Sequence, residues 1–167
     1  MVRAPLVLSL GLALFLAAAP QEPPRTALLS GDIFLEHRPP EGFPERPARL
    51  EAITRRLKET GLSARLLAIE PKAASLESLA RVHDPAYIAR VKLECERGAA
   101  QIDPPDMPLC PRSYEAARHA AGGVLAAVDA VMDGRARNAF CAVRPPGHHA
   151  LRTKAMVSVP NSGRLGS

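Results

Sequence analysis

Short apolar runs alternate with helix-like segments along this chain of 167 residues, and that order limits the folds open to it. The runs near residues 26–29, 66–69 and 138–143 predict strands. Each strand is separated from the next by segments with helical periodicity. Strands separated by helices pair in parallel, so the sequence predicts an α/β domain with a mainly parallel sheet flanked by helices.

Helix start and stop signals lie between the predicted strands. Pro47 fits the first turn of a helix, and Gly61 fits its C-terminal cap. Similar signals predict helices over residues 75–80, 84–97 and 113–134, with a proline-rich loop before the last of them. On the longest helix the apolar residues recur at helical spacing, so a broad buried face is expected at Ala117, Ala120, Ala121, Val124, Leu125, Val128 and Val131.

The residues after the third predicted strand carry most of the chemistry. Arg144 and two prolines lead into Gly147, His148 and His149, at the carboxyl end of a strand, where ligands of open α/β sheets bind. A neutral imidazole can take a proton while its neighbour donates one. Both rings can serve one site only if the backbone turns there, and Gly147 permits the positive φ that a sharp turn often needs. The sequence predicts His148 and His149 as an acid–base pair, and a plain surface loop is the alternative.

The net charge of +5 is concentrated at the two ends of the chain. Arg3, Arg152, Lys154 and Arg164 account for four of these charges, which leaves +1 for residues 21–150. The central part therefore has no basic footprint, and we expect no nucleic-acid partner.

The three cysteines are widely spaced. Cys95, Cys110 and Cys141 form no C-x-x-C pair. Their number and spacing match neither a disulfide framework nor a structural zinc site. Cys141 lies inside an apolar run and is expected to be a small buried residue.

The first 20 residues resemble a secretory signal peptide. Arg3 precedes an almost wholly apolar run over residues 6–19 that ends in small residues. That run is shorter than the roughly 20 residues that cross a bilayer, so we expect no stable membrane span. Residues 1–20 are assigned as a signal peptide and 21–25 as a linker, which implies a secreted or periplasmic location if the signal is used and a cytoplasmic one otherwise. The alternatives are an uncleaved anchor and a start codon placed too far upstream.

Four segments of the chain recur together in one known family. They are His37 with residues 44–50, residues 82–87, the helix over 113–134, and residues 140–150 with Ala155 and Met156. In this order they resemble the histone deacetylase superfamily, most closely its acetoin-utilisation and acetylpolyamine amidohydrolase-like members. The resemblance runs over residues 26–156, which are assigned as the N-terminal half of that family's catalytic domain.

The resemblance implies an arginase-like α/β fold, truncated after roughly half the domain, and zinc-dependent hydrolysis of acetyl-lysine or acetylated small amines. In such enzymes zinc polarises the amide carbonyl and its bound water, while tandem histidines act as general base and general acid. By motif, His148 and His149 are that pair, Gly147 is the turn glycine, Arg46 lines an inner channel and Asp106 grips the substrate backbone. From the residues alone, Arg46 is equally well explained as a surface charge at a helix start, and Asp106 is better explained as an ordinary turn residue.

The chain departs from the family pattern where the metal would be held. Family members take zinc ligands from an Asp-x-His segment and a second Asp downstream of the histidine pair, whereas residues 150–167 contain no Asp, Glu, His or Cys. His37, His83 and His119 lack partners at ligand spacing and are expected to be structural. A smaller departure is Phe43, where the family usually has His. We therefore expect a deacetylase-family protein by descent that is incomplete, inactive and unable to hold zinc alone.

Residues 157–167 do not follow the family pattern and are assigned as an unrelated tail. Family members commonly continue into Gly-Phe-Cys where this chain has Val157, Ser158 and Val159. Deleting one nucleotide from codons for Gly-Phe-Cys can produce codons for Val-Ser-Val, so a frameshift explains the break. A divergent C-terminus and a fusion scar are the alternatives. For the whole chain, two other hypotheses stay open: a small exported non-catalytic binding module, and a damaged reading frame.

Overall fold

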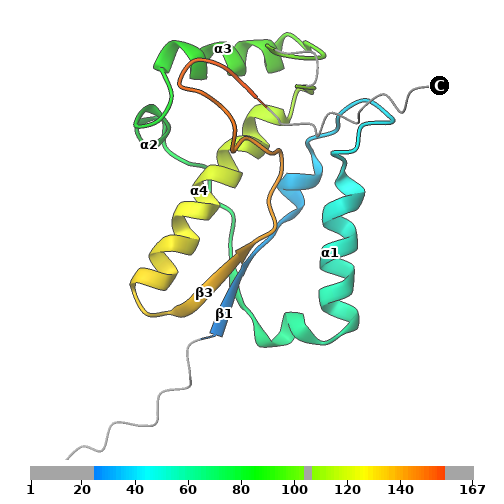
Figure 1. The fold of residues 1–167 in the computed structure, drawn as a ribbon, viewed down its shortest axis with the longest axis vertical. Helices are drawn as coiled ribbons and strands as arrows, with labels where there is room; N and C mark the ends of the chain where they lie inside the picture. Colours follow the sequence, from blue (N-terminus) through cyan, green and yellow to red (C-terminus); the bar gives the residue numbers. More distant parts are fainter. Residues whose placement is uncertain (1–24, 104–106, 157–167) are drawn as a thin grey trace, which may run out of the picture.

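Three parallel strands form the centre of the described chain (Figure 1). The computed structural model describes residues 25–103 and 107–156. β1 (Arg25–Leu29) lies between β2 (Leu67–Ile69) and β3 (Ala136–Cys141), and both neighbours run parallel to it. The predicted α/β class with a parallel sheet is therefore confirmed, and β3 is an edge strand among the described strands.

Several predicted segments lie outside the described residues. They are the signal peptide, residues 21–24 of the linker, Asp106 and the tail over 157–167. β1 begins at Arg25, so the last residue of the predicted linker belongs to the sheet. β3 starts and ends two residues earlier than predicted, because Ala136, which lies before the apolar run, already pairs with Arg25 of β1. None of the helices in the described part of the chain is long and apolar enough to cross a membrane.

Helices connect the strands and begin and end close to the predicted residues. They are α1 (Pro47–Glu59), α2 (Leu76–Ala80), α3 (Pro85–Glu96) and α4 (Ser113–Met132), with two short 3-10 helices, η1 (Asp32–Leu35) and η2 (Leu62–Arg65). The side chains of Ser75 and Asp84 cap α2 and α3 by accepting hydrogen bonds from amides of the first turn. Gly61 and Gly134 take φ values of 69° and 73° just after α1 and α4, which ends both helices.

The face that α4 buries differs from the predicted one. Its buried residues are small for the most part: Ser113, Tyr114, Ala116, Ala120, Gly123, Ala127 and Ala130. Val124, Leu125 and Val128 were predicted to be buried but are 38, 48 and 52 % exposed. Close packing explains the difference, because a β-carbon on Gly123 would lie 2.7 Å from the side chain of Leu29. Only small side chains fit between α4 and β1, so the larger apolar residues point away from the sheet.

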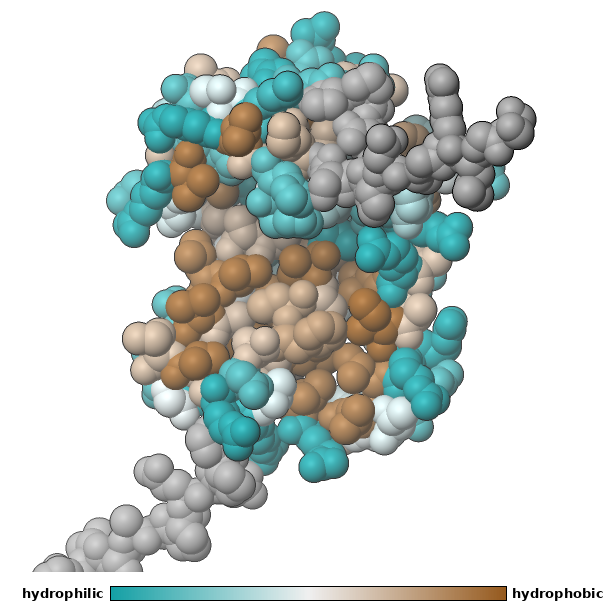
Figure 2. All heavy atoms as spheres, in the orientation of Figure 1, coloured by the Kyte–Doolittle hydropathy of each residue, from teal (hydrophilic) through white to brown (hydrophobic). Residues whose placement is uncertain are grey.

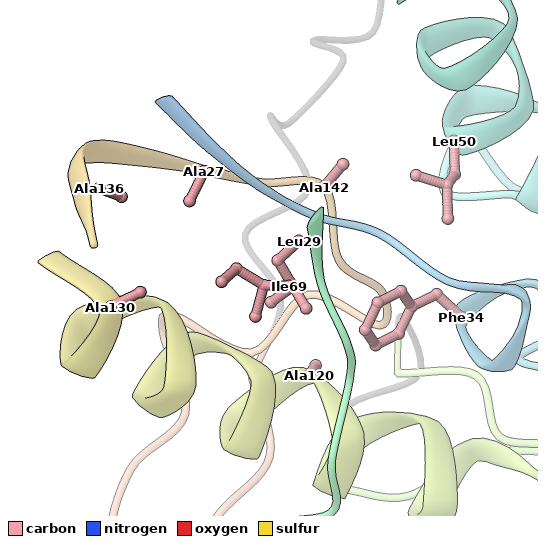
Figure 3. Close-up of a cluster of buried hydrophobic side chains, with 9 residues drawn as sticks. All are labelled: Ala27, Leu29, Phe34, Leu50, Ile69, Ala120, Ala130, Ala136 and Ala142. Atoms are coloured by element: carbon pink, nitrogen blue, oxygen red, sulfur yellow. The ribbon is translucent and has the colours of Figure 1, made fainter. Parts of the chain in front are cut away.

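Two clusters of buried apolar side chains hold these elements together. The first cluster joins the strands to α4, η1 and α1 (Figure 3), and consists of Ala27, Leu29, Phe34, Leu50, Ile69, Ala120, Ala130, Ala136 and Ala142. The second cluster draws on α3, the start of α4 and the adjacent loops, and consists of Ile88, Cys95, Ile102, Leu109, Tyr114 and Ala155. Cys141 was expected to be buried but is only partly so, because it packs against the first cluster from the edge strand.

Candidate active site at the histidine turn

His148 and His149 occupy the centre of a tight turn over residues 147–150, named here the histidine turn. The N–H group of Ala150 donates to the carbonyl oxygen of Gly147 at 2.9 Å, which closes a β-turn. The two imidazole centroids lie 4.1 Å apart with the ring planes inclined by 50°. Both histidines are exposed. The predicted backbone turn is thus present, and it brings the two rings together beyond the C-terminal end of β3.

Gly147 does not adopt the positive φ expected of it. The glycines with positive φ in the described part of the chain are Gly42, Gly61, Gly98 and Gly134. Gly147 is the first residue of its turn, a position for which common turns require no positive φ. A β-carbon on Gly147 would meet no described atom within 4 Å. Neither crowding nor a left-handed backbone therefore demands glycine at this position.

Arg144 anchors the N-terminal side of the histidine turn. Its side chain is buried, and its Nη1 and Nη2 donate to the carbonyl oxygens of Phe34 and His37 at 2.7 and 2.9 Å. Its Nε and Nη2 also donate to Oε1 and Oε2 of Glu45, the second of these at 2.9 Å. This two-pronged contact fixes the orientation of the guanidinium as well as its position. The chain leaving β3 is thereby tied to η1, to His37 just after it and to Glu45 just before α1.

His37 extends this buried polar group to α4. Its Nε2 lies 3.3 Å from Oε2 of Glu45, and its Nδ1 shares a 2.7 Å hydrogen bond with the hydroxyl of Ser113. Burial alone would raise the pKa of Glu45, but hydrogen bonds from His37 and Arg144 lower it to about 2. Glu45 is thus an ionised carboxylate enclosed by its partners. We call Arg144, Glu45 and His37, with Ser113, the buried anchor.

The C-terminal side of the histidine turn is held by a second carboxylate. Oδ2 of Asp103 accepts a hydrogen bond from the N–H group of Ala155 at 2.7 Å, and both carboxylate oxygens pair with Arg90 at 2.9 and 3.0 Å. The hydrogen bond from Arg90 lowers the pKa of Asp103, and the Ala155 N–H contributes in the same direction. Asp84 adds a backbone contact, its N–H donating to the carbonyl of Arg152 at 2.9 Å.

Of the other candidate residues, the structure describes Arg46, His83 and His119. Arg46 is exposed at the N-cap of α1, and its guanidinium forms no hydrogen bond or ion pair with another residue that the structure describes. Asp106 lies outside the described residues. His83 and His119 bond through Nδ1 to the backbone carbonyls of Leu151 and Glu115, at 3.0 and 2.8 Å. These two histidines are structural, as expected.

Sequence reasoning missed Glu45 and the burial of Arg144. The two residues are 99 positions apart, although both lie in segments that carry the family resemblance. A signal was available in the sequence, since Arg144 directly follows an apolar run. An arginine that is drawn into a core at such a point needs a carboxylate partner. His37 was correctly taken as structural, but its link to Glu45 was not foreseen.

A zinc ion does not fit the described residues. Across residues 25–103 and 107–156 no group of three or more His, Cys, Asp or Glu side chains comes together in a way that could hold a metal ion. A catalytic zinc site normally takes three protein ligands. The chemistry available at the histidine turn itself is proton transfer, since two imidazoles stand side by side on an exposed turn.

Comparison with known proteins gives the family. A model of the histone deacetylase domain matches residues 43–157. The chain is 43% identical over 113 residues to the histone deacetylase-like amidohydrolase of Pseudomonas aeruginosa, covering 68% of this chain and 29% of that protein. It is 40% identical over 123 residues to the polyamine deacetylase HDAC10 of Homo sapiens, covering 70% of this chain and 18% of that protein.

A solved structure agrees with these matches. The crystal structure of the HDA15 HD domain matches with a TM-score of 0.76 and 31% identity, covering 81% of this chain and 39% of that one. The deacetylase-like fold expected from the sequence is thereby confirmed. The chain spans less than a third of the length of the two relatives named above. Because the family model covers most of the described residues, including both the histidine turn and Glu45, the chain belongs to the histone deacetylase family.

Proposed function

We propose that this chain is the histidine-bearing part of a deacetylase domain that hydrolyses the amide bond of acetylated lysine or of small acetylated amines. The observation that carries this proposal is the pair of exposed imidazoles 4.1 Å apart on an anchored turn. The relatives named above support it, since one is a histone deacetylase-like amidohydrolase and another a polyamine deacetylase. None of them supports the alternative of a small binding module.

In this proposal the two histidines divide the proton transfers of hydrolysis between them. One neutral imidazole takes a proton from a water molecule as the water oxygen bonds to the carbonyl carbon of the acetyl group. The other, protonated, gives a proton to the nitrogen as the C–N bond breaks, which releases acetate and a free amine. His148 and His149 can share these roles because their ring centroids lie 4.1 Å apart on a single turn.

The proposed domain needs further residues beyond those described here. Figure 2 shows hydrophobic side chains gathered over β3 and the neighbouring sides of α4 and α1. The large exposed apolar side chains of these elements include Ile53, Leu125, Val128 and Phe140. A surface of this kind on an edge strand marks a place where more protein packs. We propose that the remainder of the deacetylase domain, in the same chain or a second one, covers it, and that this chain alone holds no zinc and has no activity.

A chimeric enzyme tests the proposal. Residues 43–156 of this chain replace the matching segment of the Pseudomonas aeruginosa amidohydrolase, and hydrolysis of an acetyl-lysine peptide and of an acetylated diamine is measured. The chimera should be active, and His148→Ala or His149→Ala should lower kcat/KM by about 100-fold or more. His119→Ala is the matched control, because that ring bonds to its own helix backbone.

Two results would contradict the proposal. A folded chimera that keeps its activity without both histidines would remove their catalytic role. Deacetylation by the purified chain alone, with one zinc ion retained after dialysis against a weak chelator, would show that this chain binds zinc and is active without further residues.

A further inference from the structure

We infer that Glu45 and Arg144 are positioning residues for the histidine pair: their buried contact fixes where the histidine turn stands. Arg144 precedes His148 by only Pro145, Pro146 and Gly147. Each proline holds φ near −65°, so few torsions are free between the guanidinium and the first imidazole. The position of Arg144 therefore determines the position of the histidine turn.

The contacts of Arg144 are more specific than packing requires. Its guanidinium makes four hydrogen bonds, two to the Glu45 carboxylate and one each to the carbonyls of Phe34 and His37. The Arg144 and Glu45 side chains are only 5% and 13% exposed. A buried ion pair of this kind contributes little net stability compared with apolar residues of the same size, because both charges lose their hydration. The ion pair instead fixes the orientation of the Arg144 side chain, because the planar guanidinium group binds a carboxylate in one geometry.

Glu45 is itself held from a third direction. His37 contacts the same Oε2 atom that accepts from Arg144, and Ser113 holds the other side of the His37 ring. Ser113 is the first residue of α4 and also accepts a hydrogen bond from the N–H group of Cys110 at 2.8 Å. The carboxylate therefore cannot turn away from Arg144 without breaking a chain of buried hydrogen bonds. In this way the starts of α1 and α4 fix the position of the histidine turn.

The inference has two parts with separate readouts. The positional part concerns the described residues alone. Without the two-pronged contact between Arg144 and Glu45, the distance and angle between the two imidazole rings change. The catalytic part rests on the function proposed above: a misplaced pair lowers kcat more than it changes KM, because substrate binding does not depend on the pair's exact geometry.

The positional part is tested by NMR on the full chain. The readouts are the nuclear Overhauser effect between the imidazole protons of His148 and His149, and the resonances of β1 and α4 as a measure of the fold. The variants are Arg144→Lys, which keeps the charge but loses the fork, and Glu45→Gln, which keeps the shape but loses the charge. Arg112→Lys is the matched control, because Arg112 pairs with Glu36 on the surface. His119, which bonds to the backbone of its own helix, serves as an internal reference.

We expect the signal between the two rings to be lost in Arg144→Lys and in Glu45→Gln and kept in Arg112→Lys, with the resonances of β1 and α4 unchanged. In the chimera described above, Arg144→Lys should lower kcat by about 10- to 100-fold at nearly constant KM. An unchanged ring-to-ring signal in both variants would overturn the inference. Loss of the β1 and α4 resonances in both variants would overturn it too, because the pair would then hold the fold and not the turn.

The two proposals fail separately. If the chimera is inactive while the ring-to-ring signal depends on Arg144, the proposed function is wrong and the positional inference stands. If the chimera is active and Arg144→Lys leaves both kcat and the ring-to-ring signal intact, the inference is wrong and the proposed function stands.

Discussion

Gly122 of α4 lies directly against the carbonyl group of Lys72. A β-carbon on Gly122 would stand 2.1 Å from that oxygen and 2.5 Å from the amide nitrogen of Ala74. The same amide donates to the carbonyl of Arg118 at 2.9 Å, and the Arg118 guanidinium donates back to the Ala74 carbonyl at 2.9 and 3.2 Å. The segment after β2 is thus bonded to α4 at a point where the helix has no side chain.

Gly122→Ala should therefore lower the free energy of unfolding, although alanine is the better helix former. The added methyl group meets backbone atoms, which cannot move aside as a flexible side chain would, so a loss of about 1–3 kcal/mol or more is expected. Urea denaturation followed by circular dichroism measures it. An unchanged or increased stability would show that α4 is not seated so closely.

Gly147→Ala should have the opposite outcome. No described atom lies within 4 Å of the added β-carbon, and the backbone φ is not positive. A glycine replaced under these conditions stabilises a protein by about 0.4–1 kcal/mol, because the unfolded chain loses freedom. The same denaturation assay tests this. A clear destabilisation would mean that the turn needs glycine after all, as the family resemblance implied.

Stability should fall in acid through Glu45. Its pKa is lowered from 4.5 to about 2 in the folded chain, so the folded state favours the ionised carboxylate. This contribution, on the order of 3 kcal/mol, is present above pH 4.5 and is lost as the pH falls toward 2. Urea denaturation at several pH values in this window should show a steeper loss for the natural chain than for Glu45→Gln. Parallel curves for the two proteins would contradict the buried pairing.

The exposed apolar face should make the purified chain associate with itself. Replacing both Leu125 and Val128, which are 48 and 52 % exposed, with Lys should reduce association while changing the free energy of unfolding by less than about 0.5 kcal/mol. Light scattering after size-exclusion chromatography measures the first and urea denaturation the second. Asp129→Lys on the same helix is the control for charge. Equal association of the double variant and the natural chain would show that the self-association contact does not involve Leu125 and Val128.

Local signals in the sequence predicted the elements well. The cap residues Ser75 and Asp84 and the terminating glycines Gly61 and Gly134 act within one helical turn, so a single sequence contains the needed information. The three strands were also predicted, with β3 two residues too late, because three separate apolar runs among helices leave few other arrangements.

Packing between distant segments was harder to predict. Periodicity shows which residues of α4 share a face, but it does not say whether the small or the large apolar side chains meet the sheet. Here the close approach at Gly123 decides it. The buried anchor depends on the pairing of Glu45 with Arg144, which only the folded chain brings together. The histidine pair was predictable, since adjacent residues need only a turn to share one site.

The stretch from Arg144 to Ala155 is fastened at both ends, but to different parts of the molecule. Arg144 is bonded to the backbone of Phe34, a member of the first cluster, while Ala155 is buried in the second cluster and bonded to Asp103. A small rotation of one cluster against the other cannot be taken up at either end, so it must alter the stretch between them. The position of the His148 and His149 pair thus depends on how the two clusters are set against each other.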